Sequence, residues 1–197
     1  MRRVSGHAHA AAQTRPRTPS GASSNYAPPV TAESPQWEQR LADLWASADE
    51  HTDEGFVARV EELAAELPAD SPVAAFERAG SFDSTGHPEL AVPLYRQALE
   101  HGLDGGRRRR AVIQLASSLR NLGQASESVA LLTAERDAES DELDDAVSAF
   151  LALALVDTGD ERQALSLALS ALAPHLPRYQ RSLANYAREL TDQSSCR

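Results

Sequence analysis

The 197-residue sequence contains no lysine, a single cysteine and few aromatic residues. All 19 basic residues are arginine, so no lysine is available for a Schiff base or for a nucleotide-binding phosphate loop. Cys196 alone cannot form an internal disulfide or a cysteine-based metal site, and this usage favours a reducing, cytoplasmic location. Because only 5% of residues are aromatic, the core must consist mainly of Leu, Ala and Val.

The sequence also lacks the common catalytic motifs. It contains no G-x-S-x-G, no H-E-x-x-H and no glycine-rich nucleotide loop. His87 and Glu89 match part of a deaminase signature, but the paired cysteines of that signature are missing. His7 and His9 form a pair without a third metal ligand. The sequence therefore predicts a protein that is not an enzyme and that binds neither cofactor nor metal.

Charge and hydropathy exclude two further kinds of partner. The net charge is −10, and residues 1–35 hold four arginines against one glutamate, which leaves −13 for the remainder. Such an acidic body repels phosphate backbones, so we expect no nucleic-acid partner. The most apolar stretch, residues 146–156, is too short to cross a membrane, and no apolar segment follows Arg2-Arg3 to make an export signal. We therefore expect no membrane association.

A repeat becomes visible when the chain is aligned on three glycines. Gly86, Gly123 and Gly159 are 37 and 36 residues apart, a period typical of stacked helical arrays. Residues at fixed offsets match in size: small ones seven before (Ala79, Ala116, Ala152), large apolar ones four before (Phe82, Leu119, Leu155), and small ones five after (Ala91, Ser128, Ala164). Small residues allow two helices to approach closely, and large ones fill the space between hairpins.

These offsets resemble those of the tetratricopeptide repeat family over about residues 71–176. The first repeat is the closest copy (Ala79, Phe82, Gly86, Ala91, Tyr95, Ala98), whereas Glu135 departs from the expected small residue. More narrowly, the chain resembles small actinobacterial-type tetratricopeptide proteins of unassigned role. The resemblance implies a right-handed superhelix of hairpins whose concave groove binds peptides or partner proteins, and it implies no catalytic residues.

The predicted fold is therefore all-α, a right-handed α-solenoid of helical hairpins. Residues 1–34, rich in Ala, Ser, Pro and Arg, are predicted to be a disordered tail. The repeat domain, residues 35–191, comprises a leading hairpin (35–68), three repeats (about 71–102, 107–137 and 141–174) and a capping helix (177–191). Residues 192–197 form a second tail.

Two of three apolar surfaces leave alternatives open. Trp37, Leu41, Leu44 and Trp45 share one helix face, which either packs on the first repeat or forms an exposed patch for a partner or a second copy. The helix expected over 146–156 is apolar nearly all round, so it is either covered on every side or offers an apolar binding surface. In the capping helix, an inward stripe is expected (Tyr179, Leu183, Tyr186, Leu190).

In the resembled family the first helix of each hairpin faces the groove. Counting back from the turn glycines selects the candidate partner-binding residues Phe76, Asp83, Ile113, Ser117, Arg120 and Leu153, and Gln114, Asn121 and Asp157 lie on the borders of the groove. Arg120 with Asn121 is the best ligand candidate, because a guanidinium and an amide can hold a carboxylate or a peptide backbone. Alternatively, Arg120 forms an ion pair with Asp157 or Asp83 that joins two repeats.

The run Arg107–Arg110 cannot form one basic face, because successive helical residues turn by about 100°. Either the run pairs with acidic neighbours such as Glu100, Asp104 or the next hairpin, or Arg110 contacts an acidic partner. Together these patterns predict a non-catalytic scaffold that binds a protein or peptide through a concave groove. The alternative is a homo-oligomer that assembles through the Trp37/Trp45 stripe or the apolar third repeat.

Overall fold

The structure, a computed structural model, describes residues 34–192, and every regular element in this range is helical. The helices are α1 (Pro35–Ala46), α2 (Asp53–Ala64), α3 (Pro72–Ser84), α4 (Pro88–Glu100), α5 (Gly105–Asn121), α6 (Ala125–Arg136), α7 (Asp144–Asp157), α8 (Glu161–Leu172) and α9 (Gln180–Asp192), with short 3₁₀ helices η1 (Ala48–Glu50) and η2 (Ala173–His175). The all-α prediction is confirmed. The predicted tails lie outside the described residues except for Ser34 and Asp192.

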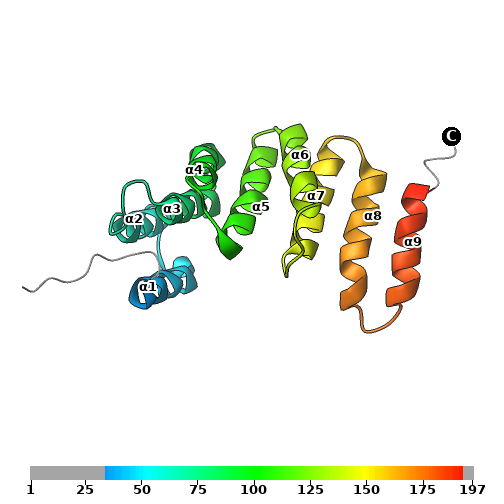
Figure 1. The fold of residues 1–197 in the computed structure, drawn as a ribbon, viewed down its shortest axis with the longest axis horizontal. Coiled ribbons are helices and arrows are strands. Elements are labelled where there is room, and N and C mark those ends of the chain that lie inside the picture. The colour runs from blue at the N-terminus through cyan, green and yellow to red at the C-terminus, as the bar shows by residue number, and fades with distance from the viewer. Residues whose placement is uncertain (1–33, 193–197) are drawn as a thin grey trace, which may run out of the picture.

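The helices follow one another along an elongated array (Figure 1). Each hairpin pairs two successive helices, α3 with α4, α5 with α6 and α7 with α8. The first helix of one hairpin then packs against the first helix of the next, so that α5 contacts both α3 and α7. The stacked helical-repeat architecture expected from the sequence is therefore confirmed.

Glycine turns every repeat hairpin through the same capping geometry. Gly86, Gly123 and Gly159 have φ of 81°, 77° and 85°. After Gly123, the amide of Gln124 donates to the carbonyl of Leu119 at 2.9 Å, and the amide of Gly123 donates to that of Arg120 at 3.0 Å. Equivalent pairs of bonds close α3 and α7, which is the Schellman arrangement. The sequence period thus has a physical basis in a left-handed residue at each bend.

We expect Gly123→Ala to lower the free energy of unfolding by about 1 kcal/mol, because a Cβ disfavours positive φ. The matched control is Gly106→Ala in α5, where φ is not positive and no atom lies within 4 Å of an added Cβ. That substitution should be stabilising by about 0.5–1 kcal/mol. Urea denaturation measures both, and an equal effect of the two substitutions would contradict the capping geometry.

Both tryptophans pack against the chain itself. Trp37 is 1% exposed and its Nε1 donates to the carbonyl of Leu63 at 2.9 Å. The Trp45 ring meets Phe56 edge-on at a centroid distance of 4.9 Å. The stripe on α1 therefore packs over α2 and α3, with Trp37 and Leu41 buried and Leu44 and Trp45 half-buried. Inward packing is confirmed for Trp37, and self-association through this stripe stays a prediction.

The last helix differs from the expectation in its start and in its buried face. α9 begins at Gln180 rather than Pro177, after Tyr179 adopts a φ of 69°. Tyr179 and Tyr186 are 76% and 63% exposed, whereas Ala187 is buried and its carbonyl accepts a bond of 2.7 Å from Ser166 of α8. A small residue is needed where α9 approaches α8 closely, so the tyrosines of the predicted stripe turn outward.

Candidate functional site

A polar pocket opens where α1, α3 and α5 meet. Its volume is about 390 Å³, and it is lined by Glu38, Leu41, Ala42, Trp45, Glu77, Arg107 and Arg110. The Trp45 ring lies 3.3 Å from the position that a Cβ on Gly80 would occupy. The first hairpin therefore covers the groove side of α3 around Gly80, and the pocket is what remains open beside it.

Arg107 joins the three helices around this pocket. Its Nε donates to Glu77 at 3.0 Å and its Nη2 donates to Glu38 at 2.6 Å. Trp45 Nε1 also donates to Glu77, at 3.1 Å. Burial raises the pKa of Glu77, and the neighbouring Arg107 opposes that shift. Arg107 and Glu77 thus hold α1 onto α3 and α5, and neither offers a free charge to a ligand.

Arg110 is the member of the arginine run that remains available. Its side chain is exposed and its guanidinium carbon lies 5.4 Å from the centroid of the Phe76 ring. It forms no salt bridge within residues 34–192. Phe76 itself is 2% exposed, so the prediction that it contacts a partner directly is wrong. Its buried ring instead positions the Arg110 guanidinium through a cation–π contact.

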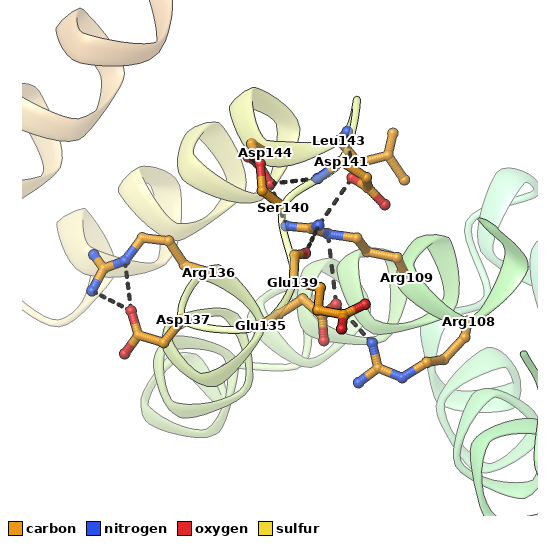
Figure 2. A network of polar contacts seen from close by, with 10 residues as sticks. All are labelled: Arg108, Arg109, Glu135, Arg136, Asp137, Glu139, Ser140, Asp141, Leu143 and Asp144. Atoms are coloured by element: carbon orange, nitrogen blue, oxygen red, sulfur yellow. Dashed lines mark hydrogen bonds and ion pairs between the residues drawn. The ribbon is translucent and has the colours of Figure 1, made fainter. Parts of the chain in front are cut away.

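Arg108 and Arg109 reach toward the end of α6 and the start of α7 (Figure 2). Arg108 pairs with Glu135 of α6 at 2.7 Å. The Arg109 side chain, 5% exposed, reaches Asp144 at 2.7 Å and Asp141 at 2.9 Å, and donates to the carbonyl of Glu139 at 2.6 Å. Pairing with the next hairpin is confirmed for Arg109, whereas Arg108 pairs within its own hairpin. Glu135, which broke the repeat pattern, is explained by its contacts with both arginines.

Asp83 joins the first and second repeats. Ser118 of α5 donates to its Oδ1 at 2.7 Å, and the hydroxyl of Tyr95 in α4 lies 3.5 Å from its Oδ2. Ser118 and Tyr95 are fully buried. Burial raises the pKa of Asp83, although both hydroxyl contacts favour the carboxylate. In this geometry Asp83 serves the packing of three helices.

We expect Asp83→Asn to become relatively more stable as the pH rises. Since the folded state raises the pKa of Asp83, it retains a proton that the unfolded chain releases, and wild-type stability from this group falls as the pH rises above about 4. The difference in the free energy of unfolding, variant minus wild type, should therefore increase between about pH 4 and pH 7. Urea denaturation across that range measures it.

Glu66→Gln is the matched control, because Arg40 lowers the pKa of Glu66 and the pH trend should have the opposite sign. The same trend in both variants would contradict the assignment for Asp83.

Arg120 pairs with Asp157 across the second and third repeats. Its Nε lies 2.5 Å from Asp157 Oδ2. This is the structural alternative that the sequence left open. Ile113, on the same helix, is 6% exposed and belongs to the core between the hairpins, so it cannot contact a partner directly. Gln114 and Ser117 are half-buried, and Asn121 is exposed. Arg120 and Asn121 therefore lie side by side, but only Asn121 has a free side chain.

The third hairpin carries an apolar opening. A hollow of about 450 Å³ between α7 and α8 is lined by Ala149, Ala152, Leu153, Val156, Glu161, Ala164, Leu165 and Ala168. Leu153 and Val156 are 47% and 49% exposed. Of the two alternatives for the apolar helix at 146–156, full coverage does not occur among residues 34–192, which leave this face open.

Comparison with known proteins decides the family. The family model described as "Tetratrico peptide repeat" matches residues 72–190, more than half of the chain. The chain belongs to this tetratricopeptide repeat family. Neither the curated proteins nor the solved structures provide a match.

Two other types of site are absent from the described residues. Over residues 34–192, no three His, Cys, Asp or Glu side chains are grouped so as to hold a metal ion. In the same range no helix has the length and hydropathy that a membrane span requires.

Proposed function

We propose that this tetratricopeptide repeat protein is a non-catalytic scaffold that binds a protein or peptide partner on the side of its first helices. The family generally mediates protein–protein interaction, which supports the class of function. Within the chain, the support is the exposed Arg110 at the mouth of the pocket between α1, α3 and α5.

The local chemistry favours an acidic group of the partner at Arg110. The guanidinium is held over Phe76, so little side-chain freedom remains to be lost when a carboxylate binds. The other arginines of the run, Arg107 to Arg109, are already paired. Asn121, Ser117, Asp157 and Leu153 would extend the contact along α5 and α7, and we place the protein in the cytoplasm as part of this proposal.

Affinity capture from the native lysate tests the proposal. Wild type is compared with Arg110→Ala and with Arg59→Ala, a control on α2 whose arginine is also exposed but pairs with Glu62. We expect one or more proteins to bind wild type and Arg59→Ala and to be lost with Arg110→Ala. If the same proteins bind all three variants equally, Arg110 is not the contact.

A further inference from the structure

The first two repeats use one face of each hairpin to receive the next helix. On the first hairpin, Phe76, Ala79, Val92 and Tyr95 pack in one core with Ala111, Leu115 and Leu119 of α5. On the second, the equivalent positions Ile113, Ala116, Val129 and Leu132 pack in one core with Val147, Leu151 and Leu155 of α7. Both incoming helices present apolar residues four apart, at the same distances from their turn glycine.

The third hairpin presents the same face, and no helix between residues 34 and 192 packs across it. The equivalent positions are Ala149, Ala152, Leu165 and Ala168, and all four line the hollow between α7 and α8. α9 does not take the place of an incoming helix, because it packs against α8 and η2 rather than across α7. Helix α9 contacts the side of α8 that carries Ser166, which follows Leu165 of the open face in sequence and points to a different side of the helix. Leu165 and Leu172 of that stripe are 49% and 47% exposed.

Carboxylates lie at both ends of this open face. Glu161 begins the α8 stripe that continues with Leu165, Ala168 and Leu172, and it forms no salt bridge with a described residue. At the opposite end Asp145 precedes Ala149 by one helical turn on α7 and contacts His175 at 2.8 Å. A second copy of this chain would bring acidic rims together, whereas a basic helix would complement them.

We propose that the open face of the third hairpin docks a basic amphipathic helix from a partner protein, which takes the position of a fourth repeat's first helix. The helix would present apolar residues four apart to Ala152, Leu165 and Ala168, as α5 and α7 do to the preceding hairpins. Basic residues near its ends would meet Glu161 and Asp145. This surface shares Leu153 with the contact proposed above but does not include Arg110. Substitutions at Arg110 and at Leu165 therefore test the two proposals separately.

The probe is a fluorescent peptide of residues 105–121, because this α5 sequence is basic and already docks on the equivalent face of the first hairpin. Titration of the full chain followed by anisotropy should show saturable binding. Leu165→Asp, at an exposed position, should weaken the affinity at least about tenfold, since it puts a charge in the apolar contact. Leu90→Asp, at the similarly exposed Leu90 on α4, is the control and should bind as wild type does.

Glu161→Arg should weaken binding by about threefold to tenfold at low salt, and this loss should diminish as the salt concentration rises. Absence of saturable binding by wild type, or equal binding by Leu165→Asp, would overturn the proposal. Light scattering tests whether a second copy of this chain occupies the open face instead. If wild type dimerises and Leu165→Asp is monomeric, a second copy occupies this face and the proposal is wrong.

Discussion

Leu151→Ala should lower the free energy of unfolding by about 3 kcal/mol, within the range for emptying a well-packed core position. Leu151 is 1% exposed and packs between α7 and the second hairpin, in the core that includes Ile113, Ala116 and Leu132. Its loss removes apolar contact and leaves a cavity at the junction between the second and third hairpins, because each repeat of such an array packs only against its neighbours along the chain. Urea denaturation followed by circular dichroism measures the change.

Leu153→Ala is the control, on the same helix and two residues away. Leu153 is 47% exposed on the open face, so its truncation should cost less than about 1 kcal/mol. Equal losses for the two leucines would show that α7 is covered on both sides, contrary to the open third hairpin.

Arg109→Ala should also cost about 3 kcal/mol, because it removes the buried cation that joins α5 to the start of α7. Glu135, whose side chain is 4% exposed, would lose one of its two arginine neighbours, and the carbonyl of Glu139 would lose its donor. The cost should stay at the lower end of the range for buried pairs, since Arg108 remains bonded to Glu135 and the side chains of Asp141 and Asp144 are 39% and 46% exposed.

Arg59→Ala removes an exposed pair with Glu62 and should change the free energy of unfolding by less than about 1 kcal/mol. If Arg109→Ala were as mild as Arg59→Ala, the network in Figure 2 would not stabilise the junction between the second and third repeats.

The repeat architecture was predictable because it depends on local rules. A left-handed residue at each hairpin bend calls for glycine, and close helix contact calls for small residues, so both leave a periodic trace at Gly86, Gly123 and Gly159. The inward packing of α1 was one of two open alternatives, and only contacts with other helices, such as those of Trp45 with Gly80 and Phe56, show it.

Whether an individual candidate residue is buried or exposed depends on the neighbouring helices, which the apolar pattern of its own helix does not specify. Phe76 and Ile113 were counted toward the groove, yet the following hairpin buries them. In α9, two sets of residues at helical spacing could form the buried face. Because α9 lies close to Ser166 of α8, the face with Ala187 is buried and Tyr186 is exposed. The partners of Arg107 to Arg110 likewise follow from four different directions around α5. Arg107 reaches Glu38 and Glu77, Arg108 and Arg109 share Glu135, and Arg110 remains exposed.

Hydrogen exchange on the complex with a partner captured by wild type, and lost with Arg110→Ala, tests the binding role most directly. The account predicts slower exchange in α5 and α7, which carry Arg110, Ser117, Asn121 and Leu153, with little change in α4 and α6. Slower exchange confined to α4 and α6 would contradict it, because the partner would then lie on the second helices of the hairpins.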